Sequence, residues 1–306
     1  MPAPYAIFCA NPLDPRSVEP DFSLEFAGAR EVGFSPILID HDELDQRISP
    51  GAALRKTRID APGIGVYRGW MLRSGAYAGL FNALLERGVR LLTSPEEYAA
   101  CHHAPGSYAL LKNWMASMTW VPLPVIDDQA EVRASLAQFG SSAVILKDYV
   151  KSQATGYWSE ACYISDASDQ DNVGRVVGRF RELQGDTLVG GLVFKAYIPL
   201  QPTGAPAHEY RAFFVGGRVV GCWPRSDLAR ELGSPPTELM AQVAMKVPSP
   251  FASADFGVDQ MGRWWLLEVG DGQVSGLPEP EAASPVFAAL ADQVRLFGES
   301  QPSRGG

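Results

Sequence analysis

The sequence lacks long hydrophobic runs, an excess of basic residues and closely spaced cysteines. No run of 18 or more apolar residues occurs in its 306 residues, so we expect no membrane-spanning helix. The formal net charge is −9 and the aromatic residues are not interleaved with basic ones, so we expect no nucleic-acid partner. The four cysteines are scattered without a Cys-x-x-Cys pair, which favours a reduced, cytoplasmic protein.

Several nucleotide-binding and catalytic motifs are also missing. Neither GxxxxGK[ST] nor GxGxxG occurs, so the sequence supports neither a P-loop nor a dinucleotide-binding fingerprint. The nucleophile motif GxSxG is absent, and Cys9 has no identifiable base partner. The stretch "MPAPYAIFCA" has no charged region before its short apolar run, and we expect a first core strand there rather than a signal peptide.

The residues that are present predict two domains or lobes, because 306 residues that are 46% hydrophobic can bury a large core. Strand and helix patterns alternate through the first hundred residues, which predicts a small open α/β domain with a parallel sheet over residues 1–98. The expected strands cover 5–10, 35–40, 63–69 and 89–94, and the expected helices cover 21–33 and 77–88.

The pattern changes after a linker. A helix begins near "SPEE" and is broken by Pro105 and Gly106, so residues 99–118 are expected to join two domains. From residue 119 onward we expect an α+β region with mostly antiparallel strands, divided into 119–191 and 192–300. One hairpin is signalled by "HEYRAFFVGGRVVGCWPR" with its Gly-Gly turn, and a second by "ASADFGVDQMGRWWLLEV".

The second hairpin carries two carboxylates. If Met261 and Gly262 form a two-residue turn, Asp255 lies opposite Glu268 and both point to one face, whereas an odd-length loop would separate them. Two like charges across a strand pair repel each other, and Mg²⁺ would relieve the repulsion, with Asp271 of the following glycine-rich loop nearby. The alternative is a solvent-facing acidic pair on an edge hairpin.

Lysines follow an apolar strand in "SAVILKDYVKSQATGYW". Lys147 ends the strand, and Lys151 and Ser152 open a loop that contains Gly156. A lysine at a strand end beside a flexible loop can neutralise phosphate oxygens. The alternative for both lysines is a surface position with the charged end in water.

Arginines of two segments are candidates for binding an anion. Glu209 and Arg211 share a face of the first hairpin, and Arg225 lies just beyond its second strand, so they form either an exposed ion pair or a site that holds an arginine near a phosphate. Arg68 follows an expected strand of the parallel sheet, where ligands of open α/β sheets gather. The alternative there is an arginine stacked on Trp70.

The order of these pieces resembles the ATP-grasp superfamily over nearly the whole chain. The strings "VYRGWML", "LLTSPEEY", "ILKDYVKS" and "LEVGDGQVSGLPE" narrow the resemblance to the R-two-K clade. It implies a pre-ATP-grasp α/β domain at 1–98, a linker at 99–118, a small α+β subdomain at 119–191 and a large one at 192–300 that contains the metal site.

The resemblance also implies roles in nucleotide binding. Lys147 matches the lysine that contacts the α- and β-phosphates, and the strand 192–198 matches the hinge that borders the adenine. The remaining nucleotide-binding positions are Lys151, Ser152, Lys195, Ala196, Tyr197 and Glu209. The backbone groups of Lys195 and Tyr197 would bond the adenine edge.

The metal and substrate positions follow in the same way. Asp255 and Glu268 match the metal-binding acids. Gly270 stands where the usual pattern has Asn, which makes Asp271 the candidate third ligand. Three arginines complete the site by resemblance: Arg211 and Arg225 at the γ-phosphate or acyl-phosphate, and Arg68 on the acceptor side.

The implied activity is that of an ATP- and Mg²⁺-dependent carboxylate–amine ligase that forms an amide through an acyl-phosphate and releases ADP and phosphate. Its partners would be small-molecule or peptide carboxylates and amines. A small-molecule kinase on the same scaffold is one alternative. A non-catalytic nucleotide-binding module is another, against which the presence of Lys147, Asp255 and Glu268 argues. The oligomeric state is left open, with a homodimer as one alternative.

Overall fold

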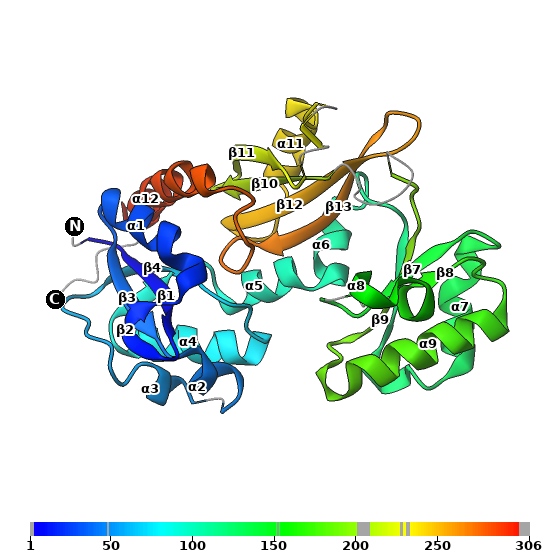
Figure 1. The fold of residues 1–306 in the computed structure, drawn as a ribbon, viewed down its shortest axis with the longest axis horizontal. Coiled ribbons are helices and arrows are strands. Elements are labelled where there is room, and N and C mark those ends of the chain that lie inside the picture. The colour runs from blue at the N-terminus through cyan, green and yellow to red at the C-terminus, as the bar shows by residue number, and fades with distance from the viewer. Residues whose placement is uncertain are drawn as a thin grey trace. The chain divides into compact units, whose positions relative to one another are not determined.

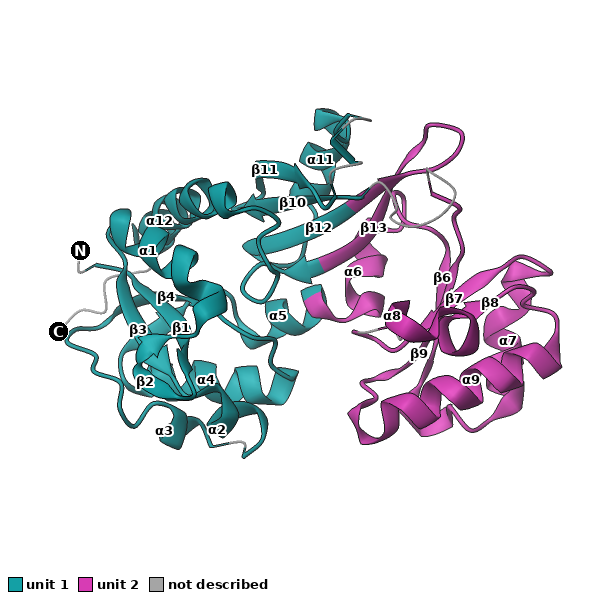
Figure 2. Ribbon diagram, viewed as in Figure 1, with its two compact units in different colours: residues 1–101, 209–255, 270–306 teal, residues 102–208, 256–269 magenta. Residues whose placement is uncertain are grey.

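The structure is a computed structural model that describes residues 3–47, 49–150, 152, 154–200, 209–226, 229–230 and 233–299. The chain forms two compact units. Unit 1 comprises residues 1–101, 209–255 and 270–306, and unit 2 comprises residues 102–208 and 256–269 (Figure 2). No helix within these described ranges is long and apolar enough to cross a lipid bilayer.

The strands and helices are labelled in Figure 1. The strands are β1 (Tyr5–Asn11), β2 (Asp14–Val18), β3 (Ser35–Ile39), β4 (Gly63–Arg68), β5 (Val89–Leu91), β6 (Met118–Pro122), β7 (Val144–Lys147), β8 (Tyr163–Ile164), β9 (Gly191–Ala196), β10 (Glu209–Val215), β11 (Arg218–Pro224), β12 (Phe251–Val258) and β13 (Trp264–Asp271). The α-helices are α1 (Ser23–Glu31), α2 (His41–Asp45), α3 (Pro50–Ala53), α4 (Ser74–Glu86), α5 (Pro95–His102), α6 (Ala104–Leu111), α7 (Gln129–Leu136), α8 (Ala154–Tyr157), α9 (Gln170–Gln184), α11 (Thr237–Ala244) and α12 (Ala283–Glu299).

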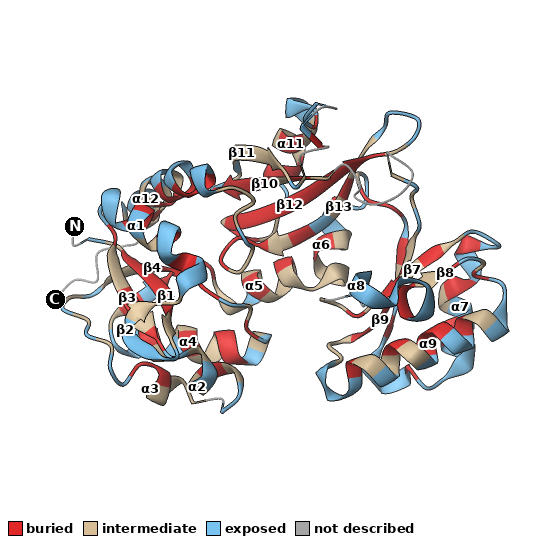
Figure 3. Cartoon of the chain, viewed as in Figure 1, coloured by how far each residue is buried: buried red, intermediate tan, exposed pale blue. Residues whose placement is uncertain are grey.

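Unit 1 begins with the parallel sheet that the alternating pattern predicts. Strand β1 pairs in parallel with β3 and β4, β4 pairs in parallel with β5, and β2 runs antiparallel to the end of β1. Alternate residues of β1 enter different cores: Ile7 and Cys9 face the cluster that includes residues of α4, whereas Ala6 and Phe8 face the cluster that includes residues of α12. Burial on both faces explains why this strand is a continuous apolar run (Figure 3).

The first predicted hairpin is confirmed. Strands β10 and β11 are antiparallel and are joined at Gly216 and Gly217, whose φ angles of +56° and +74° suit a tight two-residue turn. The hairpin belongs to a sheet of order β11-β10-β12-β13, in which β12 and β13 run from one unit into the other. Phe213 of β10 packs in one core with Phe287 and Leu290 of α12. This packing fixes the strand that carries Arg211.

The turn of the second hairpin is longer than the sequence predicts. The N–H of Asp259 donates to the carbonyl of Arg263 (2.9 Å), and the N–H of Gly262 donates to the carbonyl of Asp259 (3.0 Å). Residues 260–262 therefore form a three-residue turn, stabilised by Gly262 at φ +81° and by the Asp259 carboxylate, which accepts from the N–H of Met261. The predicted two-residue turn was wrong, and a three-residue turn is the odd-length case in which the parity argument separates Asp255 from Glu268.

Unit 2 contains an antiparallel sheet of order β6-β9-β7-β8. Helices α7 and α9 bury Val132, Leu136, Val176 and Phe180 in the core of this unit, and both begin at an aspartate that caps the helix N-terminus. The central strand β9 is paired on both edges, so its backbone is fixed along its length. Strand β7 ends at Lys147.

Candidate functional site

Two clusters of charged side chains contain most of the residues that the sequence predicts. The first, which we call the arginine cluster, consists of Glu209, Arg211, Arg225 and Asp255 in unit 1. Arg211 donates from Nε and Nη2 to the two carboxylate oxygens of Asp255 (2.7 and 2.8 Å), and Arg225 Nη1 adds a bond to Oδ2 (2.7 Å). The same Nη1 lies 3.4 Å from Oε2 of Glu209.

Burial explains why two guanidinium groups gather on one carboxylate. Every residue of β12 is buried, and Asp255 is only 5% exposed, so its charge requires hydrogen-bonded cations. Arg211 comes from β10, the neighbouring strand of the sheet, and Arg225 follows β11. The side chain of Arg225 is 41% exposed, so its guanidinium can contact both Asp255 and an anion from solvent.

The second cluster, which we call the lysine pocket, lies in unit 2. Its polar lining includes Lys147, Lys195, Glu268, Tyr149 and His102. Lys147 Nζ donates to Oε1 of Glu268 (2.5 Å), and Lys195 Nζ donates to the carbonyl of Leu267. The Lys147 side chain is 15% exposed and that of Glu268 is 52% exposed, so the acid faces solvent while the lysine is largely enclosed.

Sequence reasoning missed the side chain of Lys195, because it considered only the backbone of this strand. The register of β7 and β9 contains the signal: Lys147 is opposite Val193, and Ile145 is opposite Lys195. Residues two apart on a strand share a face, so the two lysines are diagonal neighbours on one face of the sheet. Two lysine side chains in one pocket suit a ligand with several negative charges.

The backbone donors of the predicted hinge are already engaged. The N–H of Ala196 donates to the carbonyl of Ser117 (2.8 Å), and the N–H of Tyr197 donates to that of Ala143 (2.9 Å). An adenine edge bonded to the Tyr197 N–H would have to displace the second of these bonds. The Tyr197 ring is partly exposed and packs edge-on against Tyr163, with ring centroids 5.1 Å apart.

Arg68 is an internal brace in this structure. It is 1% exposed and forms a two-point ion pair with Glu25, in which Nη2 donates to Oε1 (2.6 Å) and Nε donates to Oε2. Its Nη1 donates to the carbonyls of Gly272 (2.8 Å) and Ser275 (2.9 Å). Four of its five N–H groups are thus used within unit 1, which gives no support to the expected role of binding an anionic substrate.

Asp271 is fully buried, and both of its oxygens accept hydrogen bonds. Oδ1 accepts from the N–H and Nε2 of Gln273 (both 3.0 Å), and Oδ2 accepts from the hydroxyl of Ser249 (2.7 Å). Burial raises the pKa of this carboxyl to about 6, against the opposing effect of these donors. A carboxyl held in this way gives no support to the expected third metal ligand, and we leave it out of the proposed site.

Gly270, at the position where the resemblance expects Asn, has little room for a side chain. A Cβ atom there would lie 3.0 Å from Oγ of Ser275 and 3.3 Å from Oγ of Ser253. Ser152 is exposed, and Lys151 lies outside the described residues. Within the described part of the chain, no group of three or more His, Cys, Asp or Glu side chains could hold a metal ion.

Asp255 and Glu268, which belong to different units, are each of the type that holds a magnesium ion, because Mg²⁺ is usually held by one or two carboxylates together with substrate phosphates. Each carboxylate is neutralised by cationic side chains in this structure, Asp255 by arginines and Glu268 by a lysine. The sequence predicts a cation beside these acids, and side chains of the protein supply a positive charge at each of them.

The fold has many solved counterparts. The RimK domain ATP-grasp protein of Sphaerobacter thermophilus superposes with a TM-score of 0.64 at 15% identity, over 95% of this chain and 99% of that one. D-cycloserine synthetase DcsG gives a TM-score of 0.61 at 15% identity, over 95% and 99%. The D-alanine-D-alanine ligase of Coxiella burnetii gives 0.56 at 13% identity, over 97% of each chain.

No curated protein matches this sequence significantly. The model of the ATP-grasp domain, R-two-K clade family 3, matches residues 138–292, just over half of the chain. The predicted fold class, an ATP-grasp architecture of α/β and α+β parts, is confirmed by the solved counterparts. The resemblance drawn from the sequence is confirmed as well, and the chain belongs to the ATP-grasp family, R-two-K clade family 3.

Proposed function

We propose that the protein is an ATP-dependent ligase that joins a carboxylate to an amine. The observation that carries the proposal is the lysine pocket, where Lys147 contacts Glu268 beside Lys195. Solved proteins of the same fold include a D-alanine-D-alanine ligase and the ligase PsnB, the latter complexed with Mg and ADP. Membership of the ATP-grasp family supports the use of a nucleotide at this pocket.

The two opposite charges in the lysine pocket can each take a new partner when a nucleotide binds. Lys147 and Glu268 neutralise each other at 2.5 Å. We propose that Lys147 turns to the α- and β-phosphates of ATP, where Lys195 adds a second positive charge, while Glu268 provides a carboxylate for the metal. A Mg²⁺ ion held by Glu268 together with phosphate oxygens would neutralise those oxygens as charge develops on them. Partner exchange leaves no buried charge without an opposite one.

The arginine cluster supplies the remaining positive charge. The exposed side of Arg225 is available to the transferred phosphoryl group, while Arg211 is held in place by Asp255 and by the carbonyl of Gly276 (3.2 Å). In the proposed reaction a substrate carboxylate oxygen attacks the γ-phosphorus and ADP leaves. The amine nitrogen then attacks the acyl carbon, the carbon–oxygen bond to phosphate breaks, and the nitrogen loses a proton.

Nucleotide binding tests the role of the pocket directly. We expect Lys147→Met to weaken MgADP binding about tenfold or more in calorimetric titration, since a hydrogen bond to a charged group contributes roughly 1.5–3 kcal/mol. Lys112→Met removes an exposed lysine of the same unit and serves as the matched control. Equal affinities of the two variants for MgADP would refute the assignment of the pocket.

Product analysis tests the reaction. We expect ADP release from ATP and Mg²⁺ to require both a carboxylate and an amine, with an amide as the organic product. ADP release with a hydroxyl acceptor and no amine, accompanied by a phosphorylated product, would show a kinase instead.

Glu268→Gln should raise the Mg²⁺ concentration needed for nucleotide binding, and an unchanged Mg²⁺ requirement would remove Glu268 from the metal site.

A further inference from the structure

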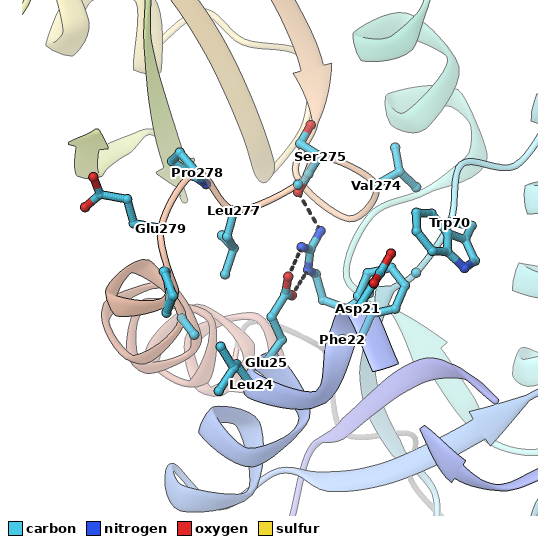
Figure 4. A pocket seen from close by; sticks show the side chains of 15 residues that line it. Asp21, Phe22, Leu24, Glu25, Trp70, Val274, Ser275, Leu277, Pro278 and Glu279 are labelled. Atoms are coloured by element: carbon cyan, nitrogen blue, oxygen red, sulfur yellow. Dashed lines mark hydrogen bonds and ion pairs between the residues drawn. The ribbon is translucent and has the colours of Figure 1, made fainter. Parts of the chain in front are cut away.

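A second pocket lies wholly within unit 1 and contains no residue of the lysine pocket. It encloses about 300 Å³ between the end of β4, the segment before α1 and the loop after β13 (Figure 4). This volume is at the lower end of the range for small-molecule sites. The pocket lies outside the carboxyl end of a parallel strand, which is where open α/β sheets bind ligands.

The walls of this pocket are acidic. Asp21, Glu25 and Glu279 line it, and Arg68 is the one cation among its described lining residues. The guanidinium of Arg68 is turned to Glu25 and to backbone carbonyls, so it offers little positive charge to a ligand. Glu279 is paired with Arg230, whereas Asp21 has no ion-pair partner within the part of the chain that the structure describes. Because arginines neutralise Glu25 and Glu279, Asp21 supplies the uncompensated negative charge of the described lining, and this charge attracts a cation.

Trp70 gives the pocket a fixed aromatic wall. Its backbone is held on both sides, because its N–H donates to Sγ of Cys9 (3.4 Å) and its carbonyl accepts from the hydroxyl of Tyr67 (2.7 Å). The residue is nevertheless 42% exposed. Phe22 meets the indole edge-on, with ring centroids 5.1 Å apart. A positioned, partly exposed indole beside carboxylates suits an organic cation, which aromatic faces attract.

The pocket also borders the arginine cluster. Gly276 lines the pocket, and its carbonyl accepts from Nη1 of Arg211, which binds Asp255. A ligand in the pocket therefore lies against the loop that contacts the proposed phosphoryl-transfer groups. Apolar side chains of Leu24, Leu277 and Pro278 complete the lining, so the ligand has room for an apolar body (Figure 4).

We propose that this pocket binds a primary amine, in its ammonium form, carried on an apolar or aromatic body. This amine is the second substrate of the ligase: the bound ammonium would lose one proton to water before its nitrogen attacks the acyl carbon, and a second proton as the amide forms. Only that role depends on the proposed function. The acidic lining and the indole recognise the ammonium group, and the apolar lining recognises the body.

Direct binding tests the proposal without nucleotide or metal. The full-length protein is titrated calorimetrically with 2-phenylethylammonium, 2-phenylethanol and 3-phenylpropanoate, which share a phenyl group and differ in charge. We expect the ammonium to bind most tightly. Asp21→Asn should weaken ammonium binding about two- to fivefold and leave the alcohol unchanged, since exposed charge pairs contribute modestly. Trp70→Leu should weaken ammonium binding by a similar factor, about two- to fivefold, and should weaken the alcohol as well.

Glu31→Gln, an exposed acid on α1 outside the pocket, is the matched control and should not change ammonium binding. Tighter binding of the carboxylate, or an ammonium affinity equal in wild type and both pocket variants, would overturn the proposal. Ammonium binding that depends on Asp21 and Trp70 without amide formation from ATP would refute the ligase function and leave the pocket assignment standing. Amide formation with no ammonium binding would refute the pocket assignment and leave the ligase function standing.

Discussion

The buried carboxyl of Asp271 predicts a pH dependence of stability with a definite sign. Burial raises its pKa from the ordinary 3.8 to about 6 in the folded chain. Between these two values the folded state therefore binds more protons than the unfolded state. The stability that this group contributes is fully present below pH 3.8 and is lost as the pH rises through about 6.

The size of the effect follows from the same two values. One pKa unit corresponds to about 1.4 kcal/mol, so the difference between 3.8 and about 6 gives about 3 kcal/mol. Asp271→Asn keeps an oxygen for Gln273 and an amide that can donate to Ser249, yet it cannot titrate. We expect the unfolding free energy of wild type minus that of Asp271→Asn to fall by about 2.5 kcal/mol between about pH 4 and pH 7.5, because the unfolded carboxyl is already partly ionised at pH 4.

Urea unfolding of both proteins across this range measures the difference, and contributions from other acids cancel. Ser249→Ala offers an internal check, because loss of its hydroxyl removes a donor to the ionised form. The pKa of Asp271 should then rise further, and the fall in stability should move to higher pH. A difference that is constant with pH, or that grows as the pH rises, would refute the assignment of Asp271 as a desolvated carboxyl.

Two further predictions concern packing in each unit. Arg68→Met should lower the unfolding free energy by about 3–5 kcal/mol in urea titrations because it leaves the buried Glu25 unpaired. Arg68→Met combined with Glu25→Leu should recover most of that loss. A loss below about 1 kcal/mol for the single variant would contradict the role of Arg68 as a brace. Gly190→Ala should cost about 1–3 kcal/mol more than Gly33→Ala, since both have positive φ but only the first would place a Cβ against the ring of Tyr149; equal losses of thermal stability would exclude the clash.

Patterns within one segment predicted the fold well. The alternation of apolar runs and amphipathic helices gave the parallel sheet of unit 1, and the Gly216-Gly217 pair gave the first hairpin within one residue of its ends. These features depend on residues that are close together in the sequence, so a pattern within one segment is enough to predict them. The turn of the second hairpin was predicted wrongly for a local reason as well. The Asp259 side chain accepts from the N–H groups of Met261 and Arg263 and stabilises a three-residue turn, with Gly262 in the left-handed conformation at its last position.

The chemistry of the site could be predicted only in part. The types and positions of Lys147, Asp255 and Glu268 suggested a phosphate and metal site, and each has an opposite charge beside it. Their partners depend on which strands become neighbours, and sequence spacing does not contain that information. Lys195 is the plainest case, because it faces the pocket only through the register that β9 takes with β7.

The loop that follows β13 shows how backbone geometry changes the interpretation of a glycine-rich stretch. "GDGQVSG" suggests a backbone that approaches a ligand, but its carbonyls in this structure approach arginines: those of Gly272 and Ser275 accept from Arg68, and that of Gly276 accepts from Arg211. Glycine is required at 272 because a Cβ there would lie 2.5 Å from the ring of Phe251. One loop thereby holds both Arg68, which lines the pocket of unit 1 proposed to bind an amine, and Arg211 of the proposed phosphoryl site. A ligand that shifts this loop in the pocket would change the bond between Gly276 and Arg211, and amine binding and phosphoryl transfer would be coupled through that bond.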